Sequence, residues 1–147
     1  RISHGKVQGR NPGSDGSTWS AFTTLRGIQA KHTGPTEAGG EFNAPAEQLA
    51  AIKARNFGPY YVKGLDSVPV NFLATLDTTG GNSGSPVLNK KGELVGLLFD
   101  GTLDAVISDW DFNPRMVRSI CVDSRYMLWQ MSTVDKTTRL LEEMGVK

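Results

Sequence analysis

The stretch from Thr78 to Gly101, TTGGNSGSPVLNKKGELVGLLFDG, surrounds one serine with glycines and then continues into two apolar runs. The runs Pro86–Leu88 and Glu93–Phe99 are joined by the polar segment NKKG, a pattern that predicts a β-hairpin. In front of the hairpin, the glycines on both sides of Ser83 permit a tight turn that exposes the serine hydroxyl. A serine held in this way is a candidate nucleophile for acyl transfer.

Acyl transfer also needs N–H donors for the oxyanion, and we expect them to be the backbone N–H groups of Gly81 and Ser83. Asn82 carries no charge, so the oxyanion hole should form without the aspartate–ammonium ion pair that activates many trypsin-type enzymes. In the alternative interpretation Ser83 only stabilises a β-turn by bonding nearby backbone. The G-x-S-x-G elbow of α/β-hydrolases does not fit, because position 85 is serine and a strand pattern follows.

The remaining chain predicts further short strands and two helical regions. Glycines and prolines are spread along it, which favours many turns. A helix is expected from Pro45 to the Gly58-Pro59 pair, and another helical region after Asp123, with Trp110, Phe112 and Trp129 forming an aromatic core beneath it. The other expected strands are Ile2–Val7, Trp19–Leu25, Val68–Leu76, Ala105–Ser108 and Arg118–Val122. We therefore predict one mainly β domain over residues 1–147, a small barrel or sandwich closed by a C-terminal helix.

Composition excludes several classes of protein. The 147 residues are 38% hydrophobic and 21% charged, as expected for a folded domain. The net charge is +1 and no cationic run exceeds Lys90–Lys91, so nothing favours a nucleic-acid partner or an anionic membrane. We expect no membrane span, no metal and no cofactor. Cys121 is the single cysteine, which rules out an internal disulfide, and its apolar neighbours predict a buried thiol.

A nucleophilic serine needs a general base, and His4 and His32 are the two histidines of the chain. His4 lies in an alternating pattern and His32 in a Gly/Pro-rich loop, so a structural or solvent-exposed role is favoured for both. The carboxylates considered as orienters of such a base are Asp66, Asp77 and Asp104.

Longer motifs resemble one known family. The segments VPVNFLATLDTTGGNSGSPVLNKKGELVGLLFDG, ISDWDFNP and RSICVDSRYMLWQM are similar to the C-terminal part of bacterial serine dipeptidyl-peptidases of the dipeptidyl-peptidase 7 and 11 type. HGKVQG, FTTLRGI and FNAPAEQL resemble the preceding stretch of that family. The resemblance implies a six-stranded-type antiparallel chymotrypsin-like β-barrel, the second of two, with a C-terminal helix and one short additional helix.

The resemblance also implies roles for individual residues. Ser83 matches the nucleophile, and the N–H groups of Gly81 and Ser83 match the oxyanion hole. Asp100 matches a residue that binds the α-ammonium group of the substrate. Gly101 matches the S1 position, where acidic-specific members carry arginine. Glycine there implies an uncharged pocket and an apolar P1 side chain.

In that family the catalytic histidine and aspartate come from the first barrel, upstream of an inserted helical domain. The resemblance thus implies a nucleophile-bearing half that is inactive alone and acts on peptides when joined to the rest of the protein. Two alternatives stay open: a self-contained small chymotrypsin-like endopeptidase and a non-catalytic barrel binding module. A surface made for the first barrel would be apolar, so we also expect a homodimer. A periplasmic or cell-surface location follows from the resemblance alone.

Overall fold

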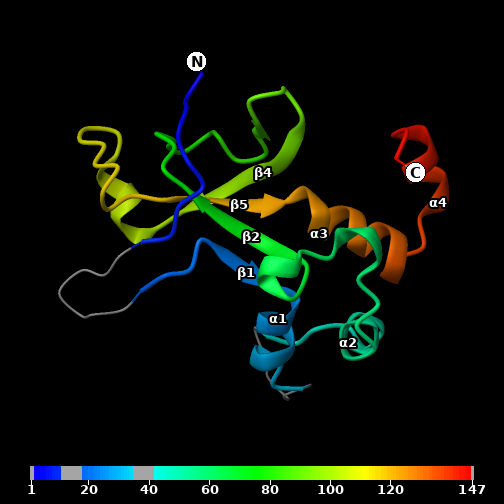
Figure 1. Ribbon diagram of the computed structural model, residues 1–147. Coiled ribbons are helices and arrows are strands. Elements are labelled where there is room, and N and C mark those ends of the chain that lie inside the picture. The colour runs from blue at the N-terminus through cyan, green and yellow to red at the C-terminus, as the bar shows by residue number, and fades with distance from the viewer. Residues whose placement is uncertain (1, 11–17, 35–41, 147) are drawn as a thin grey trace. The chain divides into compact units, whose positions relative to one another are not determined.

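The computed structural model describes residues 2–10, 18–34 and 42–146. These residues cluster into two compact units, one within residues 1–23 and 70–124 and the other within residues 24–69 and 125–147. The chain course and the labelled elements are drawn in Figure 1. The expectation of a single domain over residues 1–147 stays a prediction.

The first unit is built on a five-stranded sheet with the order β1-β2-β5-β4-β3. The strands are β1 (Phe22–Thr24), β2 (Pro69–Ala74), β3 (Pro86–Leu88), β4 (Leu94–Gly101) and β5 (Ser119–Asp123). The pairs β2–β5, β4–β5 and β3–β4 are antiparallel, as β2, β5 and β4 show in Figure 1. Alternate residues of β5 are buried, as expected for a strand with one face toward a core.

The core of this unit lies where the middle strands meet. Cys121 of β5 pairs with Phe72 of β2 on one side and with Leu98 of β4 on the other. These three side chains and Ala74 form a buried apolar cluster. The prediction of a packed thiol is confirmed, because Cys121 is 0% exposed and burial raises the pKa of its thiol to about 11.

The antiparallel sheet with accompanying helices is confirmed, as are the hairpin of β3 with β4 and the strand β5. The described sheet has five strands where the resemblance implied six. Ile2–Val7 is not a strand, since only an isolated bridge joins Val7 to Ala74. The expected strand Trp19–Leu25 is reduced to β1, because Leu25 begins the helix α1 (Leu25–Lys31).

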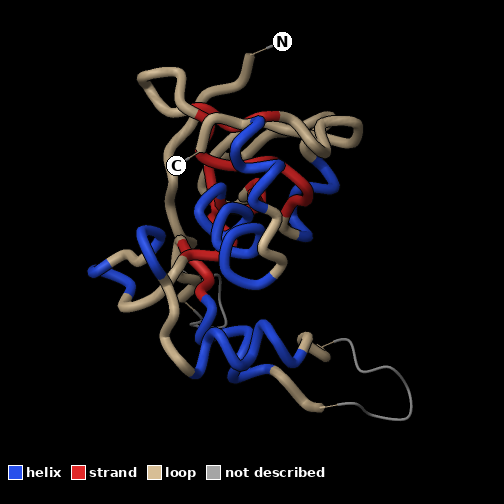
Figure 2. Tube along the Cα trace, turned by 90° about the vertical axis from the view of Figure 1, so that its right-hand side faces the viewer, coloured by secondary structure: helices blue, strands red, loops and turns tan. Residues whose placement is uncertain are grey.

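The predicted strand Ala105–Ser108 is wrong, because this segment forms the 3₁₀-helix η3 (Leu103–Ile107). Its hydrogen bonds are local: the Ala105 N–H donates to the Thr102 carbonyl at 2.7 Å, and the Ser108 N–H donates to the Ala105 carbonyl at 3.0 Å. Such short helical turns and loops separate the strands, as the blue and tan segments of Figure 2 show. An apolar run of this length does not by itself distinguish a strand from a helical turn.

Arg118 anchors the loops beside the sheet. Its guanidinium group is buried, with 2% of the residue exposed, and burial lowers its pKa. It donates hydrogen bonds of 2.6–3.2 Å to four backbone carbonyls, those of Gln8, Gly9, Pro114 and Val117. The N-terminal segment and the loop before β5 are thereby held by one side chain.

The second unit is helical. Besides α1 it contains α2 (Ala46–Lys53), the 3₁₀-helices η1 (Gly58–Tyr60) and η2 (Lys63–Leu65), α3 (Ser124–Trp129), the π-helix η4 (Gln130–Val134) and α4 (Thr138–Glu143). The helix expected from Pro45 is confirmed as α2, with Pro45 at its N-cap, but it ends at Lys53, before the Gly58-Pro59 pair. Gln48 of α2 donates from Nε2 to Tyr126 Oη at 3.0 Å and to Gln130 Oε1 at 2.9 Å, which joins α2 to α3 and η4.

The expected aromatic core is only partly correct. Trp129 is fully buried, and its indole N–H donates to the Asn56 carbonyl at 2.8 Å. Phe112 is half-buried, whereas Trp110 is 85% exposed and contributes nothing to a core. Leu103, Val106 and Ile107 of the neighbouring η3 are exposed as well. Within the described residues, none of the helices has the length and apolar character needed to cross a membrane.

Candidate active site

Ser83 lies on a turn between β2 and β3, and two glycines give that turn its shape. Gly81 has φ of +92° and Gly84 has φ of +84°, both in the left-handed region that residues with a Cβ rarely adopt. The Asn82 N–H donates to the Thr79 carbonyl at 3.2 Å, and the Ser85 N–H donates to the Asn82 carbonyl at 3.0 Å. Two successive turns therefore present Ser83 on an exposed loop, as the glycine spacing predicts.

The Asn82 side chain closes this loop on itself. Its Oδ1 accepts a hydrogen bond of 2.9 Å from the Thr79 N–H. The loop is thus stabilised by a neutral local bond rather than by an ion pair with an ammonium group.

The two expected oxyanion donors are available in the part of the chain that the structure describes. Neither the Gly81 N–H nor the Ser83 N–H donates to an acceptor of the described residues, and both residues are exposed. Exposed N–H groups without an internal acceptor are suited to receive an external oxygen atom. Their role as an oxyanion hole stays a prediction.

The loop is attached to β4 at Leu98. The Gly84 N–H donates to the Leu98 carbonyl at 2.7 Å, and the Leu98 N–H donates to the Ser85 carbonyl at 3.0 Å. The register of β4 against β5 shifts between Leu98 and Asp100, which marks a β-bulge at Phe99. The Phe99 carbonyl accepts the hydrogen bond of Ser83 Oγ at 3.4 Å.

The bulge places Asp100 and Gly101 in the same pocket as Ser83. This pocket, of about 200 Å³, is also lined by Thr78, Ala105 and Val106. Asp100 is exposed, and its Oδ1 accepts a bond of 2.7 Å from the Gly101 N–H. None of the described cationic side chains forms an ion pair with the Asp100 carboxylate. An anionic group therefore lines the pocket that contains the serine hydroxyl.

The sequence-based reasoning did not single out Thr78, Ala105 or Val106. Thr78 Oγ1 lies 2.6 Å from Ser119 Oγ, which in turn donates to the Leu76 carbonyl at 3.0 Å. This hydroxyl pair joins the loop before Ser83 to the strand β5. Ala105 and Val106 line the pocket and belong to the helical turn η3. The sequence predicted a strand there and so did not indicate that they lie beside Ser83.

Neither histidine considered as a local base is hydrogen-bonded to Ser83 in the described part of the structure. His32 Nδ1 accepts a bond of 3.2 Å from the Ala44 N–H. His4 is exposed and, together with Asp77, lines a second pocket of about 580 Å³ in the first unit. Within the described residues, the one hydrogen bond of Ser83 Oγ is the bond that it donates to the Phe99 carbonyl.

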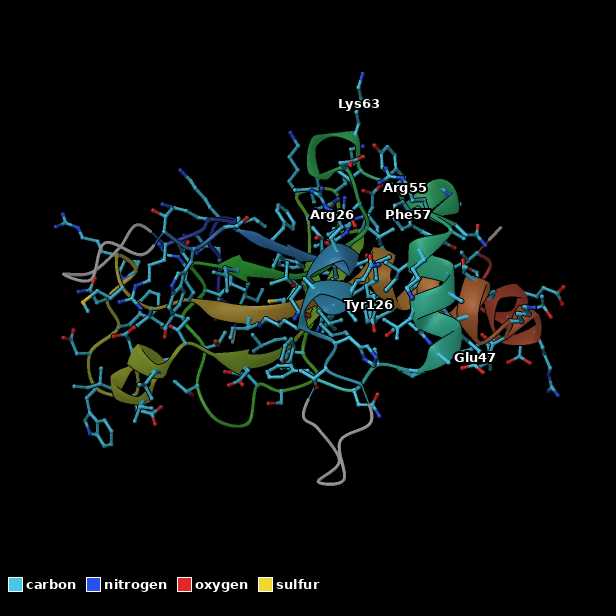
Figure 3. The ribbon with its side chains drawn as sticks, turned by 90° about the horizontal axis from the view of Figure 1, so that it is seen from below. Arg26, Glu47, Arg55, Phe57, Lys63 and Tyr126 are labelled. Carbon is cyan, nitrogen blue, oxygen red and sulfur yellow. The ribbon has the colours of Figure 1, made fainter. Side chains whose placement is uncertain are left out.

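Two of the considered carboxylates are engaged elsewhere. Asp104 pairs with Arg10. Asp66 accepts bonds of 2.7 Å from Arg55 Nη2 and from Tyr61 Oη, and these two bonds hold its pKa below the ordinary value. The Arg55 guanidinium also lies 5.3 Å from the Phe57 ring centroid, and Figure 3 shows these two residues side by side. This exposed cluster of the second unit accounts for Asp66 without a catalytic role. The described residues contain no group of three side chains suited to hold a metal ion.

Comparison with known proteins relates the chain to one peptidase family. Residues 1–146 match the profile of Peptidase S46. The chain is 45% identical to an Asp/Glu-specific dipeptidyl-peptidase of Shewanella putrefaciens and 39% identical to dipeptidyl-peptidase 7 of Porphyromonas endodontalis, over 99% of its length in both cases. It covers 22% and 17% of those two proteins, so it spans about a fifth of their length.

A solved structure gives the same result. The crystal structure of P. endodontalis DPP11 in complex with the dipeptide Arg-Glu superposes with a TM-score of 0.90 at 36% identity. The match covers 99% of this chain and 20% of that one. With sequence and fold in agreement over nearly its whole length, the chain belongs to the Peptidase S46 family.

Proposed function

We propose that this chain is the nucleophile-bearing part of a serine dipeptidyl-peptidase, which releases dipeptides from the free N-termini of peptides. The observation that carries the proposal is the pocket shared by Ser83, Asp100 and Gly101. It combines a nucleophile, an anion for a substrate ammonium group and an uncharged floor. The relatives are named as dipeptidyl-peptidases, in agreement with this combination.

In the proposed reaction, Ser83 Oγ attacks the carbonyl carbon of the second residue of the peptide while a base takes its proton. The Gly81 and Ser83 N–H groups donate to the resulting oxyanion. The intermediate then collapses, the C–N bond breaks, and the departing amine receives the proton. Water hydrolyses the dipeptidyl ester on Ser83, releasing the dipeptide and restoring the hydroxyl.

Asp100 accounts for the length of the product. A carboxylate near the nucleophile binds the substrate ammonium by a charge-assisted bond and fixes how far the peptide enters. A peptide whose first amine is acetylated lacks this charge. The enzyme should therefore cleave free peptides and leave acetylated ones intact.

Gly101 supports a preference for apolar P1 side chains. The relatives include both Asp/Glu-specific and dipeptidyl-peptidase 7 proteins, so the P1 preference is inferred from the residue. Gly101 brings no cation into the pocket to pair with an acidic side chain. Leucine or phenylalanine at P1 should be preferred to aspartate or glutamate.

The test uses the longer peptidase that carries this chain. We expect dipeptide release from peptides with a free N-terminus and leucine at P1, and its loss by about 10⁴- to 10⁶-fold in Ser83→Ala. Ser85→Ala, two residues away on the same loop, serves as the matched control. Cleavage inside acetylated peptides, or full activity of Ser83→Ala, would refute the proposal.

The homodimer and the cellular location are further parts of the proposal. Leu103 and Trp110, 87% and 85% exposed, are large apolar side chains in contact with solvent, and such exposure favours self-association. Sedimentation of the 147-residue chain should show a dimer at high concentration, and a monomer throughout would argue against it. For the intact protein we propose the periplasm or cell surface of a bacterium, which cell fractionation would check.

A further inference from the structure

We propose that Ala105 on η3, together with Gly101, determines the size of the pocket beside Ser83, because a side chain at position 101 and the side chain of Ala105 exclude each other. The proposal rests on the proposed function, since this pocket would receive the P1 side chain. It assigns P1 selection to a pair of residues on two elements, β4 and η3, rather than to position 101 alone.

The first observation is a close approach. A Cβ added to Gly101 would lie 2.9 Å from the Ala105 Cβ, closer than carbon atoms pack in proteins. Gly101 is not among the described glycines with positive φ, so its backbone conformation is open to any L residue. The obstacle to a side chain at position 101 is therefore Ala105 and not backbone strain.

The second observation is that Ala105 is held in place. The Ala105 N–H donates to the Thr102 carbonyl at 2.7 Å, at the start of η3. Thr102 is buried and is fixed twice to Arg118: its N–H donates to the Arg118 carbonyl at 2.8 Å, and its Oγ1 accepts from the Arg118 N–H at 3.1 Å. The Arg118 guanidinium holds four further carbonyls. A shift of η3 away from β4 would strain the two bonds that join Thr102 to Arg118.

The third observation is that η3 forms part of the pocket wall. Ala105 and Val106 both line the pocket, and Val106 is 74% exposed while Ala105 is half-buried. The Ala105 methyl group therefore limits the depth available to a P1 side chain more directly than Val106 does. Removing it should favour larger side chains at P1, and enlarging it should favour smaller ones.

The experiment is a double-mutant cycle in the full-length peptidase with Gly101→Ala, Ala105→Gly and the double variant. Substrates carry alanine, leucine or phenylalanine at P1, and the readouts are kcat/KM and the thermal unfolding midpoint. Gly101→Ala should lower kcat/KM for leucine at P1 by about ten-fold or more, because the pocket is overpacked. The double variant should recover most of that loss. Ala105→Gly alone should raise the phenylalanine-to-alanine ratio of kcat/KM by roughly ten-fold.

Gly80→Ala provides the matched control. Gly80 lines the same pocket, and a Cβ added there meets no atom within 4 Å. Combined with Ala105→Gly, it should show additive effects, without recovery. Ala105→Leu, which retains helix propensity, should reverse the substrate ratio toward alanine at P1.

The outcomes separate the two proposals. One result is that the unmodified enzyme releases dipeptides while Gly101→Ala and Ala105→Gly have additive effects on both activity and unfolding midpoint. That result would overturn only the pairing of positions 101 and 105. An unmodified enzyme that releases no dipeptide would overturn the proposed function and this inference with it. Recovery in the double variant, absent from the Gly80 control, would support the inference.

Discussion

The two halves of β4 differ in burial and in register, and the candidate site lies at the more exposed half. From Leu94 to Leu98 the buried residues are Gly96 and Leu98, with half-buried Val95 and Leu97 between them, and Leu97 and Leu98 pair with Val122 and Cys121 of β5. From Phe99 to Gly101 the register shifts and the residues face the pocket. The first half pairs with β5 residue by residue, whereas the second half skips Phe99 and then pairs Asp100 and Gly101 with Ile120 and Ser119 in a shifted register.

The difference shows how a strand can serve both the core and a site. Leu98, the last buried residue before the bulge, makes two backbone hydrogen bonds with the Ser83 loop, one to Gly84 and one to Ser85. The next residue, Phe99, accepts the bond from Ser83 Oγ. The Ser83 loop is thus attached to β4 next to the β-bulge. The bulge places Asp100 and Gly101 in the same pocket as Ser83.

Of the changes proposed for the Ser83 loop and β4, a substitution of Gly81 should lower the activity of the longer peptidase most. Gly81→Ala places a Cβ on a backbone with φ of +92° and should displace the expected oxyanion donor, lowering kcat about 100- to 1000-fold in the longer peptidase. Gly92→Ala in the β3–β4 hairpin is the matched control, since Gly92 has φ of +80° and its Cβ would also meet no neighbouring atom. Both variants should lose similar stability, and equal losses of activity would refute the role of Gly81.

Asp100→Asn tests the exposed half of β4 with a smaller expected effect. Removing the charge while keeping the shape should raise KM for peptides with a free N-terminus by about 10- to 100-fold, the range for one hydrogen bond to a charged group. Steady-state kinetics would measure it, with the exposed Asp111→Asn as control. An unchanged KM would remove Asp100 from substrate binding.

Cys121 of β5, the partner of Leu98, tests the packing of the buried half of β4, and its expected effect is the smallest. Burial raises the pKa of its thiol from 9.0 to about 11, so the unfolded chain ionises first as the pH rises. The resulting contribution to stability is present below pH 9 and is lost between pH 9 and 11. Urea unfolding at pH 7.5 and pH 10 should show a loss about 1 kcal/mol larger in the natural protein than in Cys121→Ala. Equal losses would mean that the thiol is not shielded.

Local sequence patterns predicted the elements that local chemistry determines. Glycines around Ser83 and the polar NKKG connection were sufficient for the exposed turn and the hairpin of β3 and β4. Proline at position 45 marked the start of α2. In each case the residues that determine the structure are neighbours in the chain.

The sequence did not reveal features that depend on distant contacts. The bulge at Phe99 is a feature of the pairing of β4 with β5, and Thr102 at the start of η3 is hydrogen-bonded to the distant Arg118. A buried arginine is itself uncommon, and nothing near Arg118 in the sequence indicates it. The roles of Asp100 and Gly101 came from the family resemblance, because an Asp-Gly pair alone indicates only a turn.

The central claim is that Ser83 is a nucleophile whose base lies outside this chain. Labelling with a fluorophosphonate, followed by mass spectrometry of the adduct, compares the 147-residue chain with the longer peptidase. The account predicts an adduct on Ser83 in the longer protein, none in its Ser83→Ala variant and none in the chain alone. Rapid stoichiometric labelling of Ser83 in the chain alone would contradict it and would favour a self-contained peptidase.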